Sequence, residues 1–135
     1  MPLDDTTLPS GLKHLTFGTN FNQILDNTTL PCGLQTLTFG RKFNQSLDNA
    51  TLPSGLQTLT FGEAFNQSLE NTTLPCGLQS LTLGLKFNQI LDTLPSGLQS
   101  LTLEGARCMD TTTLPNGLQS LTLGGPRRDY LWDYI

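Results

Sequence analysis

Residues 52–73 read LPSGLQTLTFGEAFNQSLENTT, and residues 30–51 read LPCGLQTLTFGRKFNQSLDNAT. The two stretches are nearly identical over a period of 22 residues. Ordinary amphipathic patterning does not preserve side-chain identity in this way, so one structural unit has been copied along the chain. One proline marks the same point in each copy, at Pro9, Pro31, Pro53, Pro75, Pro95 and Pro115. Its spacings of 22, 22, 22, 20 and 20 residues predict coils that stack on one another as a solenoid.

Each copy is predicted to contain one strand bounded by turns. Pro53 cannot donate a hydrogen bond to a sheet, so it should precede the strand, and Gly55 makes Pro-x-Gly a turn in which glycine permits a positive φ. Leu59 and Phe61 alternate with threonines, which is the period of a half-buried strand, and Gly62 ends it. No segment has the length or the periodicity of a helix. We expect an all-β, leucine-rich-repeat-like β-solenoid of about six coils of 20–22 residues, with one main parallel sheet and little or no helix.

Three columns of matching residues are expected to line the turns and interior of the solenoid. Stacked aromatic rings should form a spine at Phe21, Phe43, Phe65 and Phe87. Leucines four residues later should point the same way, at Leu25, Leu47, Leu69 and Leu91. The third column is Asn22, Asn44, Asn66 and Asn88. Their side-chain amides can bond backbone groups of their own coil and of the next, which would otherwise be left unpaired at a bend.

One domain of three parts is predicted for the 135 residues. Residues 8–124 form the repeat solenoid, residues 1–7 an N-terminal cap or leader, and residues 125–135 a C-terminal cap or tail. The aromatic segment Asp129–Ile135 either covers the last coil, because an open sheet edge needs protection, or is a frayed terminus. Since every coil offers its neighbour almost the same surface, we expect a monomer or an end-to-end dimer.

Composition and charge narrow the classes of partner. The net charge of −4 and the 13% of charged residues argue against nucleic acid, whose binding requires clustered lysines and arginines. No apolar run approaches the roughly 20 residues that span a bilayer, and MPLDDTTLPS lacks the apolar core of a signal peptide. We therefore expect an intracellular, cytoplasmic protein with no membrane partner.

The three cysteines are expected to be free thiols. Cys32 and Cys76 occupy the same repeat position two coils apart. That places them roughly 9–10 Å from each other, which is too far for a disulfide. Cys108 falls at a different point of its coil. This cysteine usage agrees with an intracellular protein.

Catalysis is not expected, and neither is a cofactor. An active site needs a nucleophile, a base and orienting groups in one pocket, but the only histidine is His14, in a predicted exposed strand column. Acidic residues recur in matching loops, at Asp26, Asp48, Glu70 and Asp92. Hydrated turns are the favoured interpretation of this column. Calcium, which prefers oxygen ligands, is a minor alternative.

The outward side of the predicted sheet is the best candidate for binding. Its hydroxyl-rich columns contain His14, Thr16, Thr36, Thr38, Thr58, Thr60, Ser80, Thr82, Ser100 and Thr102. Specificity should lie where the coils differ, which selects the variable loop residues Arg41, Lys42, Glu63 and Lys86. We expect protein–protein interaction; an unspecialised scaffold or a fragment of a longer repeat protein is the alternative. Ice binding is a minor one, because the Thr-x-Thr array repeats about every 6.7 Å along a strand and 4.8 Å between strands.

The combined pattern LPxGLxxLTxGxxFNQxL resembles the FNIP repeat, a short relative of the leucine-rich repeat named for its Phe-Asn-Ile-Pro core. The likeness covers residues 8–124 and rests on the Leu-Pro opening, the Leu-x-x-Leu-x-Leu/Phe-Gly strand and the Phe-Asn pair. The chain has Gln23-Ile24, Gln45-Ser46, Gln67-Ser68 and Gln89-Ile90 in place of Ile-Pro. The resemblance implies a protein-interaction module of the kind attached to F-box or kinase domains in protist and giant-virus proteins. Nothing in this chain resembles an F-box or a kinase, so the resemblance implies a recognition surface without an effector domain.

Overall fold

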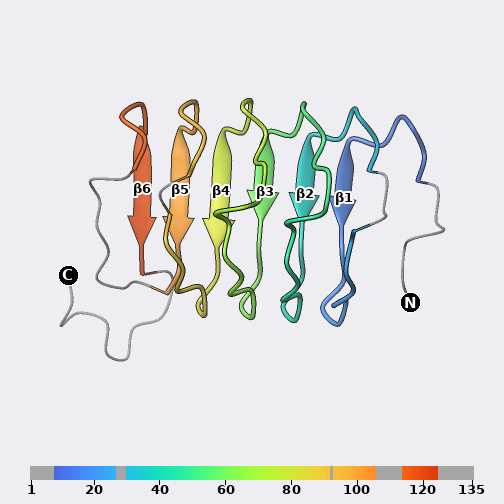
Figure 1. Cartoon of the computed structure of the whole chain (residues 1–135), viewed down its shortest axis with the longest axis horizontal. Coiled ribbons are helices and arrows are strands. Elements are labelled where there is room, and N and C mark those ends of the chain that lie inside the picture. The colour runs from blue at the N-terminus through green and yellow to red at the C-terminus, as the bar shows by residue number, and fades with distance from the viewer. Residues whose placement is uncertain (1–7, 27–29, 92, 106–113, 125–135) are drawn as a thin grey trace.

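The structure is a computed structural model that describes residues 8–26, 30–91, 93–105 and 114–124. It contains one parallel sheet with one strand from each repeat (Figure 1). The strands are β1 (His14–Thr16), β2 (Thr36–Thr38), β3 (Thr58–Thr60), β4 (Ser80–Leu83), β5 (Ser100–Leu103) and β6 (Ser120–Leu123). They lie side by side in chain order, and the described residues form no helix. The predicted all-β, leucine-rich-repeat-like solenoid is therefore confirmed.

The register of the sheet follows the repeat. Each strand residue faces the residue at the same position of the next copy, as Leu37 faces Leu59 and Leu81 faces Leu101. The second of these pairs spans a copy of 20 residues instead of 22, so the missing residues are lost from the loops and not from the strand. A slip by one residue would turn every leucine of a strand to the outside, and this penalty holds the register.

The Pro-x-Gly turn forms as predicted, but its glycine does not adopt a positive φ. The backbone N–H of Leu56 donates to the carbonyl of Pro53 at 3.2 Å, which closes a four-residue turn. Gly55 does not have a positive φ; among the described residues only Gly124 does, at 71°. A Cβ built on Gly55 would lie 3.7 Å from the nearest atom, the carbonyl oxygen of Cys32. The expectation that this glycine supplies a positive φ was wrong, because the turn type that forms is open to most residues.

The glycine after the strand is the one that the stacking requires. A Cβ on Gly62 would lie 2.4 Å from the carbonyl oxygen of Gly40, and a Cβ on Gly84 would lie 2.3 Å from that of Gly62. Here the backbones of successive coils approach too closely for any side chain. In the fifth repeat the close contact moves one residue on, since a Cβ on Gly105 would lie 2.1 Å from the carbonyl oxygen of Leu85.

Two columns of phenylalanine fill the core of the first coils, in near-parallel stacks. The predicted spine has ring centroids 6.1 Å apart between Phe43 and Phe65, with an interplanar angle of 5°. A second column runs through the ends of the strands, with Phe39 and Phe61 at 5.3 Å. Within one coil the two columns also stack on each other, as in the pair Phe61–Phe65 at 3.9 Å. The aromatic spine is confirmed, and it is one half of a double stack.

The asparagine column is confirmed as a ladder between coils. The backbone N–H groups of Asn44, Asn66 and Asn88 each donate to the side-chain oxygen of the asparagine one coil earlier, all at 2.8 Å. A glutamine adds a second rung: Gln67 Nε2 donates to Asn44 Oδ1 at 3.1 Å. The same glutamine bond recurs in the coils on either side. The side-chain oxygens of Asn22, Asn44 and Asn66 therefore each accept two hydrogen bonds from the next coil, which ties the turns together outside the sheet.

Candidate interaction surfaces

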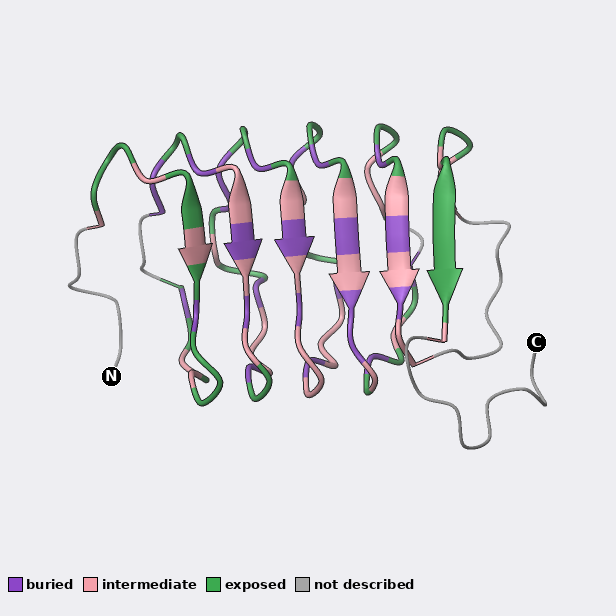
Figure 2. Ribbon diagram, turned by 180° about the vertical axis from the view of Figure 1, so that it is seen from behind, coloured by how far each residue is buried: buried purple, intermediate pink, exposed green. Residues whose placement is uncertain are grey.

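The outer face of the sheet carries the residues that the sequence predicted for it. In β2 and β3 a fully buried leucine, Leu37 or Leu59, lies between two half-buried threonines. This alternation is visible along the strands in Figure 2, where the central residue is buried and its neighbours are not. The two outward columns are His14, Thr36, Thr58, Ser80, Ser100 and Ser120, and Thr16, Thr38, Thr60, Thr82, Thr102 and Thr122.

The two outward columns contain no lysine, arginine, aspartate or glutamate, and His14 is their one titratable residue. Every other member of the two outward columns is a threonine or a serine, and the register places the hydroxyls opposite one another from strand to strand. His14 lies at the start of β1, is exposed, and faces Thr36 in the ladder. A hydroxyl can both donate and accept a hydrogen bond, so such columns can match polar groups of either kind on a partner.

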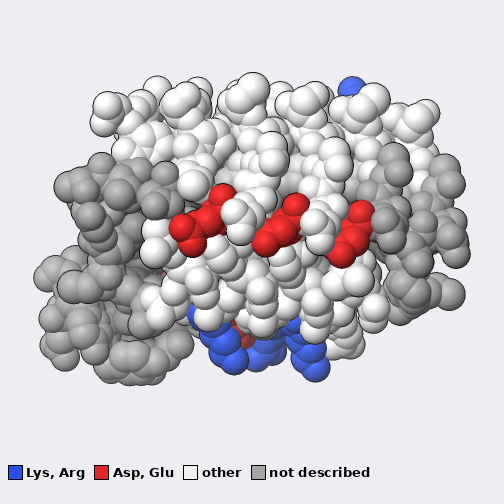
Figure 3. Space-filling model, in the orientation of Figure 1, with Lys and Arg blue, Asp and Glu red and all other residues white. Residues whose placement is uncertain are grey.

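The variable residues Arg41, Lys42, Glu63 and Lys86 lie together on the turns that follow the strands. Backbone ladder bonds connect these turns: the N–H of Lys86 donates to the carbonyl of Glu63 at 3.1 Å, and that of Ala64 donates to Arg41 at 3.0 Å. Arg41 Nε and Glu63 Oε1 form an ion pair at 2.9 Å, with the arginine side chain 69% exposed. Lys42 and Lys86 are exposed. The basic side chains form an edge along the bottom of the molecule in Figure 3, beside the ends of the strands.

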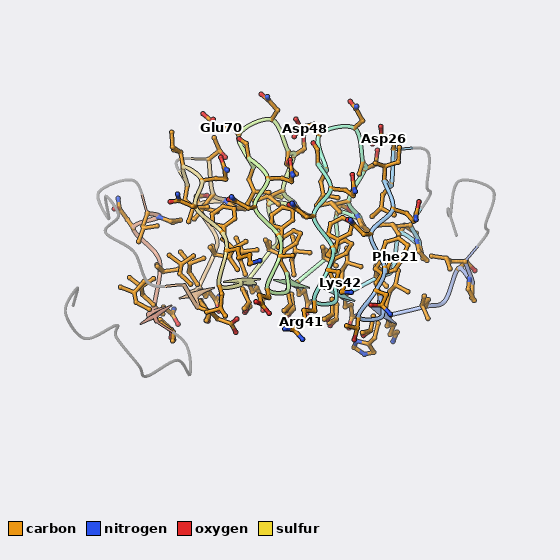
Figure 4. The ribbon with its side chains drawn as sticks, turned by 90° about the horizontal axis from the view of Figure 1, so that it is seen from below. Phe21, Asp26, Arg41, Lys42, Asp48 and Glu70 are labelled. Atoms are coloured by element: carbon orange, nitrogen blue, oxygen red, sulfur yellow. The ribbon has the colours of Figure 1, made fainter. Side chains whose placement is uncertain are left out.

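The acidic residues Asp26, Asp48 and Glu70 form a row on the wall opposite the sheet. Figure 3 shows this row across the middle of that wall, and Figure 4 shows it along one side of the solenoid, with Arg41 on the other. Two of these carboxylates, Asp48 and Glu70, each accept a hydrogen bond from a hydroxyl. Thr72 Oγ1 donates to Asp48 Oδ1 at 3.1 Å, and Ser68 Oγ accepts from the N–H of Glu70 at 3.2 Å.

These carboxylates are not gathered into a coordination site. Asp92, the fourth predicted member of the row, lies outside the described residues. Within the described ranges, no three side chains of histidine, cysteine, aspartate or glutamate come together to hold a metal ion. The geometry that is present, one exposed carboxylate in each of three successive coils, fits a hydrated turn.

Two sets of residues that the sequence marked only as departures from the FNIP pattern were not assigned a place in the ladder or on the surface. The glutamines of the second ladder rung, Gln45, Gln67 and Gln89, follow the asparagine in each copy that has the Phe-Asn pair, and that recurrence could have identified them. Ile24 and Ile90 are 56% and 61% exposed. Their repeat position holds serine in the copies between them, and this signals a site that faces solvent.

Cys32 and Cys76 are exposed and free. Cys108 lies outside the described residues, as do the predicted N-terminal leader at 1–7 and the predicted cap or tail at 125–135. In the part of the chain that the structure covers, no helix is long and apolar enough to cross a membrane.

The fold and these surfaces define the class: a parallel β-solenoid built from leucine-rich-repeat-like coils. The sequence profile of the FNIP Repeat family matches residues 1–42 and 43–86. The chain belongs to the FNIP repeat family.

A solved structure supports the same class. The crystal structure of CroV588, described as a novel circular LRR protein, superposes with a TM-score of 0.69 at 34% sequence identity. The match covers 90% of this chain and 22% of CroV588, so the chain spans about a fifth of that protein's length. A search of curated proteins finds no match.

Proposed function

We propose that this chain is a non-enzymatic recognition module whose outer sheet face docks a protein partner. The observation that carries the proposal is the pair of hydroxyl columns on one parallel sheet, held in register across neighbouring strands. A rigid sheet presents these groups without ordering them on binding, which lowers the entropic cost of association.

The sheet face suits a partner that is held by hydrogen bonds more than by charge. Thr38, Thr60 and Thr82 follow one another on neighbouring strands, and each is only half-buried. Because the face carries almost no charge, affinity there should change little with salt concentration, in contrast to nucleic-acid binding. The same feature argues against nucleic acid as the partner.

The variable edge would supply specificity. Arg41, Lys42 and Lys86 place three cations beside the ends of the strands, and Glu63 adds one carboxylate paired with Arg41. A rim charge steers a partner and rejects one of like charge more than it adds affinity. A partner that contacts both the hydroxyl face and this edge would therefore carry acidic groups on one side of its contact surface.

The exposed free cysteines Cys32 and Cys76 support a reducing compartment as the place of action, and we propose the cytoplasm. A second candidate function is a structural segment of a longer repeat array. The solved neighbour favours it, since this chain superposes on about a fifth of a circular LRR protein.

Two double variants with the same added charge test the recognition proposal. Thr38→Lys with Thr60→Lys places two cations on the sheet face, whereas Ile24→Lys with Ile90→Lys places two on the exposed outer turns. The immobilised wild-type chain is used to capture proteins from a lysate, and the affinity of a captured and identified protein is then measured for all three forms.

We expect the sheet-face variant to lose at least tenfold in affinity, about 1.4 kcal/mol, while the affinity of the outer-turn variant stays near that of the wild type. Circular dichroism checks that both variants remain folded. Equal losses in the two variants would show that added charge alone is responsible. An unchanged affinity in both would exclude the sheet face and leave the structural-segment function as the better account.

A further inference from the structure

The two ends of the solenoid expose residues that are buried everywhere between them. In β6, Leu121 and Leu123 are 39% and 36% exposed. Their neighbours in the register are Leu101 and Leu103, which are 0% and 9% exposed. β5 has β6 on its outer side, whereas no described strand lies on the outer side of β6.

At the opposite end of the solenoid, residues of the first coil are likewise less buried than their equivalents in the second coil. Leu15 is half-buried, whereas its register neighbour Leu37 is 0% exposed. Phe21 is also half-buried, whereas Phe43, stacked on it at 6.0 Å, is 0% exposed. One end therefore offers an apolar face formed by β6, and the other an apolar face formed by β1.

The backbone groups at the two ends also match. Between β2 and β3, the N–H groups of Gln57 and Thr58 donate to the carbonyl of Gln35 at 2.8 and 3.0 Å, and the N–H of Phe39 donates to the carbonyl of Thr60 at 2.8 Å. The same set joins β1 to β2, through Lys13 O and Phe17 N. Two donors and one acceptor on the later coil thus meet one acceptor and one donor on the earlier coil.

Applied to the ends, this repeated set leaves complementary groups facing outward. By repeat position, the outer edge of β6 presents the carbonyl of Gln119 and the N–H of Leu123. The outer edge of β1 presents the N–H groups of Lys13 and His14 and the carbonyl of Thr16. These are the groups that would form one more interface of the kind that already joins β2 to β3.

We propose that the β6 edge binds the β1 edge of a second copy of this chain, so that the sheet continues from one molecule into the next. The register then pairs Ser120 with His14, Leu121 with Leu15 and Thr122 with Thr16 of the second copy. Residues 114–124 carry no charged side chain, so nothing at this edge repels the approaching coil. The contact buries the leucines of both ends and pairs the open backbone hydrogen-bonding groups of the two edges that meet.

This contact is heterologous, because it joins two different surfaces. Each complex keeps one free β6 edge and one free β1 edge, so association continues to a filament or closes into a ring. Two β6 edges could pair only antiparallel, which would reverse one solenoid and break the columns of leucine and of turns. The chemistry therefore selects a head-to-tail contact over a symmetric one.

Two variants that each block one end test the direction of the contact. Leu121→Lys with Leu123→Lys places charge on the β6 face. His14→Pro removes an outward N–H from β1 at the first residue of that strand, where proline is tolerated, and leaves the bonds to β2 intact. Ser120→Lys with Thr122→Lys is the matched control, since it adds the same charge to the same strand on its outward side.

Sedimentation velocity over a wide range of concentration gives the readout. We expect the wild type and the control to grow in mass with concentration and each blocked variant to stay monomeric. An equimolar mixture of the blocked variants should form a dimer and nothing larger, because one variant brings an intact β1 edge and the other an intact β6 edge. Circular dichroism confirms that each variant is folded.

Several outcomes would overturn the proposal. A wild type that stays monomeric at every concentration would mean that other residues of the chain cover the ends. If the His14→Pro variant self-associates and the Leu121→Lys/Leu123→Lys variant does not enter its complexes, β6 pairs symmetrically with β6 of a second copy. A second measurement does not depend on the blocked variants folding. In a chain whose native cysteines are replaced by serine, Thr16→Cys with Thr122→Cys should oxidise to a ladder of disulfide-linked multimers, and the absence of that ladder also refutes the contact.

Discussion

Replacing Gly62 with alanine should test the close contact between successive coils without changing any other feature of the repeat. The new Cβ would lie 2.4 Å from the carbonyl oxygen of Gly40, 2.7 Å from its carbonyl carbon and 2.9 Å from the Cα of Arg41. All three atoms belong to backbone, so no side chain can rotate away to make room. The second and third coils must move apart at this point.

The cost follows from the bonds on either side of the clash. Phe39 N–H donates to Thr60 at 2.8 Å and Ala64 N–H donates to Arg41 at 3.0 Å, and both bonds must lengthen when the coils separate. Two weakened hydrogen bonds cost about 0.5–1.5 kcal/mol each, and overpacking adds about 1–3 kcal/mol. Alanine restricts the unfolded chain, which returns about 0.4–1 kcal/mol. We expect a net loss of about 3 kcal/mol in the free energy of unfolding, a large part of the total for a domain of this size.

The chain offers a matched control in Gly55. It is in the same repeat, its φ is not positive, and an added Cβ would lie 3.7 Å from its nearest neighbour. Gly55→Ala should therefore be neutral or stabilising by up to about 1 kcal/mol. Equilibrium urea unfolding, followed by circular dichroism, measures both variants against the wild type.

The same difference is expected in the second and fourth coils, where a Cβ on Gly40 or Gly84 would meet backbone at 2.2 or 2.3 Å and a Cβ on Gly33 or Gly77 would not. If Gly62→Ala unfolds within about 0.5 kcal/mol of Gly55→Ala, outside the range expected for overpacking, the close approach of the coils does not limit the residue at that position. A change in the slope of the transition instead of its midpoint would mean that the repeats had ceased to unfold as one unit.

Three further changes test the ladder, the core and the exposed edge by the same urea assay. Asn66→Ala removes an oxygen that accepts two hydrogen bonds from the next coil, so it should cost about 1–3 kcal/mol; Asn66→Asp keeps the acceptor and should recover most of that loss. Leu59→Ala should cost about 2–5 kcal/mol because this side chain is fully buried. Leu121→Ala is in the same column but 39% exposed, so it should cost under about 1 kcal/mol for the monomer. Equal losses in the two variants would contradict the difference in burial. Glu63→Gln should change stability by less than about 1 kcal/mol because its ion pair with Arg41 is on the surface, and a larger, salt-insensitive loss would contradict that interpretation.

Much of the candidate site could be predicted because comparing the copies of the repeat shows which positions are constant and which vary. A residue that recurs at one position must serve a contact common to every coil, and Leu59 and Thr60 therefore predict an inward and an outward column. Residues that break the repeat must lie where the coil tolerates change, and Arg41 and Glu63 are indeed on the turns that follow the strands. Their pairing was not predictable, because it depends on the spacing and offset of neighbouring turns.

Two other features escaped prediction for physical reasons. The sequence contains glycine at the positions of Gly55 and Gly62 in every copy but the fifth, which has Glu104 at the second position, and it cannot tell a permissive turn from a steric contact between coils. It also contains leucine at both Leu101 and Leu121, with the same flanking residues. Only one is buried, because burial depends on the coil beyond it.

By itself the sequence determined the period, the parallel register, the inward and outward columns and the membership of the FNIP repeat family. These are properties of one coil and its copy, and they follow from the recurrence of the same side chains at a constant spacing. The tertiary structure alone decided which glycine lies against the backbone of the neighbouring coil, how asparagine and glutamine share the ladder, and which core residues remain exposed at the ends. Each of these is set by distances between coils, and such distances exist only after the chain has stacked.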